Sequence, residues 1–112
     1  MTTLLALFRR PDGGDEALAT FERAYAETHL PVIADTPGLR AIRCQRVVEG
    51  LGAATDLCLA TAMDFDDRAA LDAGLGSDAM RAAGRNLREI APGLATLLVV
   101  ESAEDLVPAA WR

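Results

Sequence analysis

The residues best suited to acid–base chemistry lie in one stretch, Phe21–Leu39, which holds the only histidine of the chain, His29, and the only tyrosine, Tyr25. At 3.6 residues per helical turn, His29 continues an apolar stripe whose members are three and four residues apart, namely Leu18, Phe21 and Tyr25. An imidazole on such a face, one turn from a phenol, can transfer protons near neutral pH. A hydrogen-bonded core histidine has the same pattern, so a structural and a functional interpretation both stay open here.

The helix that carries this stripe is expected to run from about Asp15 to His29, because Pro31 disfavours helical geometry in the residue before it. His29 would then lie in the last turn, where the helix dipole favours the imidazolium and raises the pKa. Burial would lower the same pKa. Since neither effect clearly dominates, we expect a pKa of about 6 to 7, close to the unperturbed value of about 6.5.

Composition limits the classes of protein to consider. The chain has 112 residues, of which 51% are hydrophobic, enough for the core of one domain without disulfides or metal. The formal net charge is −6 and every basic residue is an isolated or paired arginine, which argues against a nucleic-acid partner. No apolar run approaches the roughly 20 residues that span a bilayer. The first residues place the basic pair after the apolar run, unlike a signal peptide. We therefore expect a cytoplasmic protein.

No metal or cofactor is expected from the residue types. A single histidine without clustered ligands is a poor metal site, and no glycine-rich phosphate loop precedes a helix, so a nucleotide cofactor is not expected. Cys44 and Cys58 lack metal-site spacing and fall within predicted strands. We expect both to be small buried residues in a reducing compartment.

Four strands are predicted, at Thr3–Arg9, Arg40–Glu49, Asp56–Phe65 and Leu94–Glu101. The second strand carries polar residues on both faces, which favours a sheet edge or a polar lining. Asp66 or Asp67 is expected to cap a short helix that ends near Gly74 and Gly76. Ser77 is expected to cap a second helix after it.

A repeat underlies this order. Pro37-Gly38-Leu39 leads into the second strand and Pro92-Gly93-Leu94 leads into the fourth, an offset of 92 − 37 = 55 residues. The chain therefore divides into two β-α-β halves. This predicts an α+β, ferredoxin-like βαββαβ fold, with a four-stranded antiparallel sheet and helices on one face. Since the strands supply apolar side chains to both faces, the second face needs a cover, and a second copy of the chain would provide it.

The domain is expected to comprise residues 1–102, and residues 103–112 form a C-terminal tail. Trp111 is the only tryptophan, and burying its indole would remove a large apolar area from water. We predict that Trp111 docks on its own subunit or on the partner. A frayed terminus is the alternative.

The pattern Tyr25-x-x-x-His29-x-Pro31, followed by Pro37-Gly38-Leu39, resembles EthD-like members of the dimeric α+β barrel superfamily. The resemblance covers about residues 3–101, and Leu98–Glu101 is similar to the last strand of the family. It implies a homodimer whose sheets pack face to face, and a pocket between sheet and helices in each subunit. Relatives include small cofactor-free monooxygenases, muconolactone-type isomerases and polyketide cyclases. This chain departs from the pattern at Asp64, where relatives often have a large aromatic residue.

Two functions are compatible with these residues. The first is a cofactor-independent enzyme, of oxidoreductase or monooxygenase, isomerase or cyclase type, acting on a small, partly apolar carbonyl or phenolic compound. His29 would be the acid–base catalyst, and Tyr25 would orient the substrate or stabilise an oxyanion. The second is a non-catalytic small-molecule-binding or accessory dimer in a degradative or biosynthetic pathway. An open cavity at His29 would favour the first, and a pocket filled by side chains would favour the second.

Three further residues are candidates for substrate binding: Phe21, Arg43 and Asp64. Asp64 can act as a second acid–base group if it points inward, or it can cap the helix that follows. Arg43 can hold an anionic oxygen, or it can be a surface arginine of an edge strand. No metal ligands are proposed.

Overall fold

The computed structural model, which describes residues 1–112, contains four strands and four α-helical segments. In chain order they are β1 (Thr2–Arg9), α1 (Gly14–Ala24), a π-turn (Tyr25–His29), α2 (Leu30–Ile33), β2 (Ala41–Arg46), β3 (Leu57–Phe65), α3 (Arg68–Leu75), α4 (Asp78–Ile90) and β4 (Ala95–Glu101). Two 3₁₀ turns follow, at Glu104–Leu106 and Ala109–Trp111. None of the helices has the length and apolar character needed to cross a membrane.

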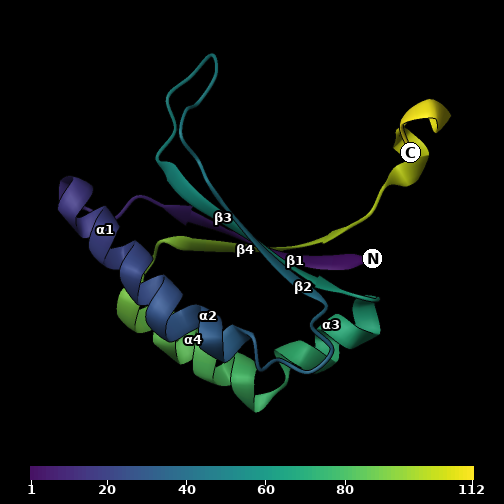
Figure 1. The fold of residues 1–112 in the computed structure, drawn as a ribbon, viewed down its shortest axis with the longest axis horizontal. Helices are drawn as coiled ribbons and strands as arrows, with labels where there is room; N and C mark the ends of the chain where they lie inside the picture. Colours follow the sequence, from purple (N-terminus) through teal and green to yellow (C-terminus); the bar gives the residue numbers. More distant parts are fainter.

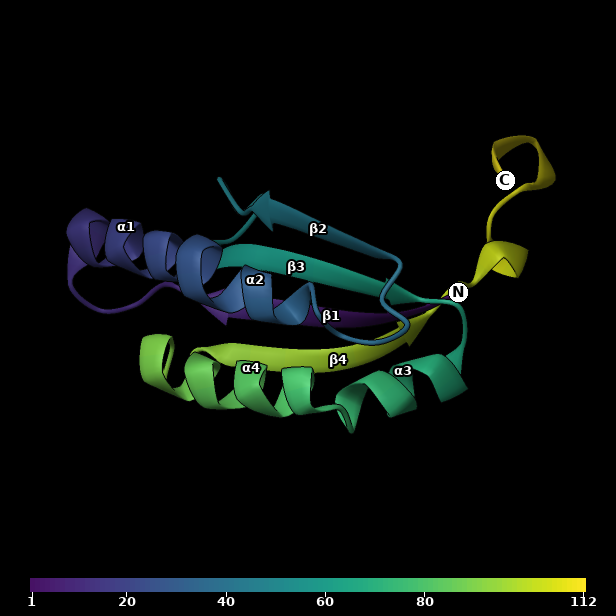
Figure 2. The same ribbon diagram turned by 60° about the horizontal axis from the view of Figure 1, so that its bottom comes forward.

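The strands form one antiparallel sheet in the order β2-β3-β1-β4, and the helices cover one of its faces (Figures 1 and 2). This is the predicted α+β, ferredoxin-like arrangement. The strand β2 lies at an edge, as its polar pattern indicated. The uncovered side of the sheet is called the open face below.

Alternation along β1 separates the two faces. Every second residue, from Thr2 to Phe8, is buried, while Leu5 and Leu7 between them are only half-buried. The ring of Phe8 packs in the core against Phe21 and Tyr25, with centroids 5.5 and 5.1 Å away. The buried set therefore faces the helices, and the half-buried leucines face the open side.

Side-chain caps begin the two helices of the second half. Asp67 accepts a hydrogen bond from the backbone N–H of Ala70 at 2.8 Å, and the Ser77 hydroxyl accepts one from Met80 at 3.2 Å. Both caps were predicted. Asp66, the alternative cap, instead pairs with Arg40 at 2.8 Å. The helix α3 ends at Leu75 with Gly76 as its C-cap, as expected.

The predicted end of the first helix at His29 was wrong. The chain stays helical through the π-turn and α2 to Ile33, with Pro31 in the first turn of α2. A proline is tolerated in a first turn, where its missing N–H leaves little unsatisfied. The wider π-turn before it is closed by a bond from the Leu30 N–H to the Tyr25 carbonyl, five residues back. His29 therefore lies one turn before the end of the helical segment.

The two cysteines differ in burial. Cys58 is buried as predicted, but Cys44 is exposed, which corrects the expectation that both would be buried. The cause is the edge position of β2, whose outer side has no neighbouring strand. Neither cysteine forms a disulfide.

The chain leaves the sheet after Glu101. In Figure 1 the C-terminal segment, drawn in yellow, rises from the sheet on the side opposite the helices. Trp111 is exposed. Docking of this tryptophan on its own subunit, one alternative of the prediction, was therefore wrong, whereas docking on a partner stays a prediction.

Candidate functional site

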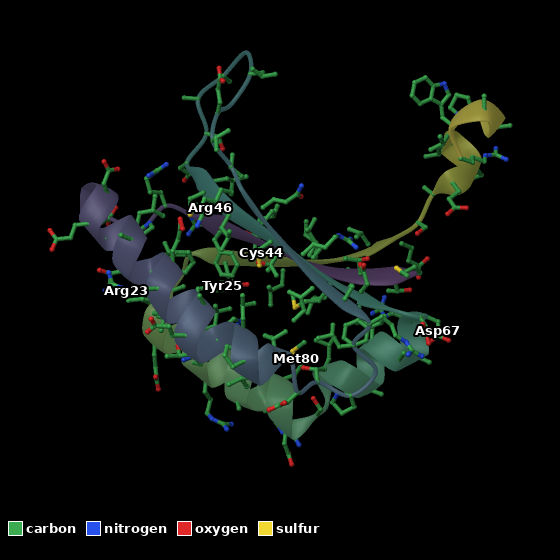
Figure 3. All side chains as sticks on the ribbon, in the orientation of Figure 1. Arg23, Tyr25, Cys44, Arg46, Asp67 and Met80 are labelled. Carbon is green, nitrogen blue, oxygen red and sulfur yellow. The ribbon has the colours of Figure 1, made fainter.

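A cavity of about 120 Å³ lies between the sheet and the helices, and 11 of its 13 lining residues are hydrophobic. Both methionines of the central region line it, Met63 from β3 and Met80 from α4, and Leu97 of β4 forms part of the wall. His29 contributes the one imidazole among the lining residues. Figure 3 shows Tyr25 and Met80 in the space between the helix layer and the sheet. The predicted apolar stripe thus brings the imidazole into an apolar cavity.

The ring of His29 is held from one side by Tyr25. The two rings are stacked, with centroids 4.9 Å apart and planes inclined by 30°. Only 4% of the surface of His29 is exposed. The π-turn contains both residues and sets their spacing.

Hydrogen bonds fix the tautomer of His29. The Thr28 hydroxyl donates to the Ala24 carbonyl at 2.6 Å, so it accepts a bond from the Asn86 amide nitrogen at 3.2 Å. The amide oxygen of Asn86 is then directed at His29 Nδ1, 3.0 Å away. Because that oxygen only accepts, Nδ1 carries the hydrogen and Nε2 keeps its lone pair. Nε2 makes no hydrogen bond within the chain.

Burial lowers the pKa of His29 below 6.5, while the hydrogen bond to Asn86 acts in the opposite direction. Of the two effects expected from the sequence, burial and the helix dipole, burial therefore dominates the pKa of His29. The continuation of the helix to Ile33 also removes His29 from the last turn, where the dipole would act most strongly. At neutral pH the imidazole is uncharged and ready to accept a proton at Nε2.

Tyr25 contributes its ring to the cavity and its hydroxyl to the sheet. The hydroxyl donates to the Thr61 side chain at 2.7 Å, and Thr61 in turn lies 3.4 Å from the sulfur of Cys44. Burial raises the pKa of Tyr25 to about 12, although the bond to Thr61 acts against this. The phenol is therefore neutral, and its only proton is already donated within the protein.

Phe21 does not line the cavity. It is buried behind Tyr25, with ring centroids 5.7 Å apart, and also packs on Phe8. Its contribution in this structure is to the core that positions Tyr25.

Arg43 and Asp64 lie together on the open face, away from the cavity. Asp64 pairs in register with Thr3, whereas the neighbouring pair Leu4 and Met63 lines the cavity on the other side of the sheet. The Thr3 hydroxyl donates to Asp64 at 2.7 Å, and the guanidinium of Arg43 donates to both carboxylate oxygens. Asp64 is thus neither a helix cap nor a neighbour of His29.

The charge state of Asp64 follows from these partners. Burial acts to raise the pKa of the carboxyl, but the hydrogen bonds from Thr3 and Arg43 and the charge of Arg43 outweigh it and lower that pKa. Asp64 is 2% exposed and remains ionised. A carboxylate held in this way is a poor proton donor.

Sequence reasoning missed Asn86, the residue that fixes the His29 tautomer. A signal was present, because Ala83, Asn86 and Ile90 are three and four residues apart on α4. An amide on the stripe of a helix that faces the core indicates a buried hydrogen-bond partner.

No protein-family model matches this chain, and no curated protein sequence matches it. A solved structure of an ethyl tert-butyl ether D (EthD) family protein from Bacillus halodurans is 28% identical, with a TM-score of 0.81, over 91% of this chain and 98% of that one. A dimeric protein of unknown function and ferredoxin-like fold from Bacteroides fragilis is 19% identical, with a TM-score of 0.65, over 90% and 95%.

A third solved structure is that of a mutant of SnoaB, a cofactor-independent oxygenase from Streptomyces nogalater. It is 16% identical, with a TM-score of 0.61, over 96% of this chain and 97% of that one. At this identity the likeness concerns the fold alone, as it does for the Bacteroides protein. The Tyr25–His29 helix, the strand order and the match to the EthD structure agree, so the chain is similar to an EthD family protein and has the ferredoxin-like α+β fold of these dimeric structures.

Proposed function

We propose that this protein is a cofactor-independent enzyme, of monooxygenase, isomerase or cyclase type, that moves a proton with His29 on a small, mostly apolar carbonyl or phenolic compound. The observation that carries the proposal is a neutral imidazole in an apolar cavity, with Nδ1 bonded to Asn86 and Nε2 unpaired. The likeness to an EthD family protein supports it, as does the use of the same fold by a cofactor-independent oxygenase.

The proton would pass from the substrate to Nε2. A phenolic O–H, or a C–H beside a carbonyl, would face this nitrogen. As the imidazolium forms, the oxygen of Asn86 stabilises it by accepting the Nδ1–H bond. Because Asn86 is uncharged, it orients the ring without holding the proton permanently, so His29 can return it to the product.

The cavity limits the size of the ligand. Its volume of about 120 Å³ is slightly below the about 150 Å³ of an apolar cavity that binds benzene. A single six-membered ring therefore needs only small movements of the wall. Met63 and Met80 are flexible enough to supply them. Larger substrates would enter by displacing Leu75 and Leu97, which are partly exposed at the cavity.

We place Tyr25 in an orienting role through its ring. The hydroxyl is committed to Thr61, whereas the ring stacks on His29 and lines the cavity. Of the other predicted binding residues, Phe21 supports this ring, and Arg43 and Asp64 lie on the other face of the sheet.

The proposed enzyme works as a homodimer in the cytoplasm. Neighbouring structures of this fold are described as dimeric, and the open face carries half-buried or exposed apolar side chains such as Leu5, Leu98 and Val100. Covering that face with a second copy would remove these side chains from water. A monomer by light scattering at micromolar concentration would contradict this part of the proposal.

The test begins with small phenols, quinones and lactones screened by thermal shift, with phenol and benzene as the smallest probes. Since His29 is the only histidine, its ring protons give isolated NMR signals that report occupancy directly. We expect phenol to shift these signals. Ala83→Leu, which places a larger side chain in the buried cavity wall, should abolish the response while leaving His29 in place.

Turnover of the best ligand is then compared between the wild type, His29→Gln and a control, Arg85→Gln, on the exposed side of α4. His29→Gln should reduce turnover by about 10²–10⁴-fold, the usual contribution of general acid–base catalysis. Arg85→Gln should leave it unchanged. Turnover by His29→Gln at the wild-type rate would overturn the assignment. Binding that requires His29 without any turnover would support the accessory-protein alternative.

A further inference from the structure

The most exposed large apolar side chains of the chain gather on two segments. They are Val48 and Leu51, 91% and 89% exposed, and Trp111 and Leu106, 83% and 79% exposed. The first two belong to the loop between β2 and β3, residues 47–56, called the loop arm. The other two belong to residues 102–112, called the tail arm. Such a concentration of apolar surface outside the core indicates a contact surface.

Both arms frame the open face of the sheet. In Figure 1 they rise on the side opposite the helices, the loop arm from one end of the strands and the tail arm from the other. The loop arm follows the end of β2, and the tail arm follows the end of β4. A body placed on the open face would therefore lie between two apolar arms.

The tail arm has a defined shape that its own hydrogen bonds maintain. Ser102 is its last residue bonded to the domain, through Met1 at 3.2 Å. Beyond it, hydrogen bonds stay within the arm, and Arg112 Nε donates to the carbonyls of Glu104 and Val107 at 3.0 and 2.9 Å. The arm is folded back on itself with its indole directed to solvent.

The two arms add apolar area to the open face of the four-stranded sheet. A stable interface buries about 800 Å² of accessible surface per partner, and one buried tryptophan contributes about 150–250 Å² of it. Burial of Trp111 would therefore supply a large part of a contact that is centred on the open face.

We propose that a second copy of the chain packs on the open face. The loop arm and the tail arm of each protomer then contact the partner protomer, and Trp111 is buried against it. This rests on the proposed homodimer and goes beyond it. An apolar face flanked by apolar arms is self-complementary, as a two-fold interface requires. Glu104 and Asp105 stand beside Leu106, and their charge disfavours an anionic membrane or a nucleic acid as the occupant.

Trp111 reports on this contact directly because it is the only tryptophan. In the full-length protein, its emission should be shifted to the blue where sedimentation shows a dimer. Dilution to monomer should return it to the wavelength of free indole in water. An emission shifted to the blue at every concentration, including the monomer, would mean docking within one subunit and would overturn the proposal.

Substitutions measure the contribution of each arm. Trp111→Ala and Leu51→Ser should each weaken dimerisation at least about tenfold, as expected for anchor residues, and Trp111→Phe should largely restore it. The control is Val99→Thr, on the helix side of β4 and away from both arms. Its dissociation constant should match the wild type. Leu98→Asp, on the open face, should abolish the dimer.

The remaining outcomes separate this proposal from the others. A dimer of unchanged affinity in Trp111→Ala, with free-indole emission in the wild type, would overturn the contact by the arms and leave the open-face dimer standing. A dimer that survives Leu98→Asp would place the partner elsewhere and overturn both. Binding of phenol to His29 is measured independently, so the catalytic proposal does not depend on any of these results.

Discussion

On each face of the sheet one buried side chain, His29 or Asp64, has a lowered pKa, yet the two charge states are opposite. On the helix side, burial keeps His29 neutral beside the uncharged Asn86. On the open side, Thr3 and Arg43 overcome the effect of burial and keep Asp64 ionised. A lowered pKa therefore leaves His29 as a neutral proton acceptor, whereas it leaves Asp64 as a permanent anion.

The partner of a buried group decides whether it can react. The neutral amide of Asn86 orients His29 without fixing its charge state, so the imidazole can still gain and lose a proton. A guanidinium neutralises Asp64, so taking up a proton would sacrifice an ion pair and its hydrogen bonds. This contrast supports the proposal of proton transfer on the helix side and of assembly through the open side.

The largest expected effect is on the open side, from Arg43→Met. It would leave the carboxylate of Asp64 buried with only the Thr3 hydroxyl as a partner. The guanidinium side chain is 59% exposed, so the loss should fall below the 3–5 kcal/mol of a fully buried pair, at about 2 kcal/mol. Urea unfolding measures this. Adding Asp64→Asn to Arg43→Met should recover part of the loss, and no recovery would mean that the charge of Asp64 is not the cause.

A second variant tests whether the helix side can be made to resemble the open side. Asn86→Asp would give His29 a charged partner at Nδ1, which should raise its pKa by about one unit or more, equivalent to about 1.4 kcal/mol per unit. The isolated NMR signals of His29 give the titration curve. Turnover at neutral pH should fall, since more of the imidazole is already protonated. A pKa at or below that of the wild type would contradict the hydrogen bond from Nδ1.

Tyr25→Phe should cost about 1 kcal/mol, the value of one neutral hydrogen bond, because it removes only the bond to Thr61. Ligand binding should be nearly unchanged, since the ring and its stacking on His29 remain. Thermal unfolding and the phenol titration are measured side by side. A large loss of binding with intact stability would show that the hydroxyl, and not the ring, contacts the ligand.

The smallest effect is a two-step loss of stability in acid. For both groups the folded-state pKa is lowered, so the unfolded chain binds more protons and stability falls as the pH falls. The step from His29 begins below about pH 6.5, with a slope of at most about 1.4 kcal/mol per pH unit. Asp64 contributes to the step below about pH 4, which it shares with Asp66 and Asp78, because arginine partners lower the pKa of those two carboxyls as well. Unfolding at a series of pH values should show the upper step disappear in His29→Gln. Its persistence there would assign it to another group.

The fold could be predicted because its signals are local and repeated. Alternation in β3 and the second copy of the Pro-Gly-Leu motif fix the strands and their order of appearance. Alternation along β3 also determines the face on which Asp64 lies. Large residues at positions 59, 63 and 65 share one face, so the side chain at position 64, with the alanines at 60 and 62, has to face the other way.

The site was only partly predictable because its contacts join distant residues. The stripe of Tyr25 and His29 is visible in a single helix, but Asn86 lies 57 residues away, and no periodicity relates the two. The end of the helix was missed for a different reason. The rule for a residue before proline is a preference, and Leu30 is helical in spite of it, with φ −59° and ψ −38° where the π-turn meets α2.

The π-turn also has a consequence for how relatives of this chain should be compared. Each of its hydrogen bonds spans one more residue than in an α-turn. Residues after the π-turn are therefore rotated about the helix axis by about 100° relative to their positions in a regular helix, which is the angle of one α-helical residue. A relative with a regular helix would bring its histidine to the same wall with one residue fewer between Phe21 and the proline. The correct alignment of two such chains contains a gap inside a helix, and an alignment that forbids the gap would match His29 to a residue on a different face.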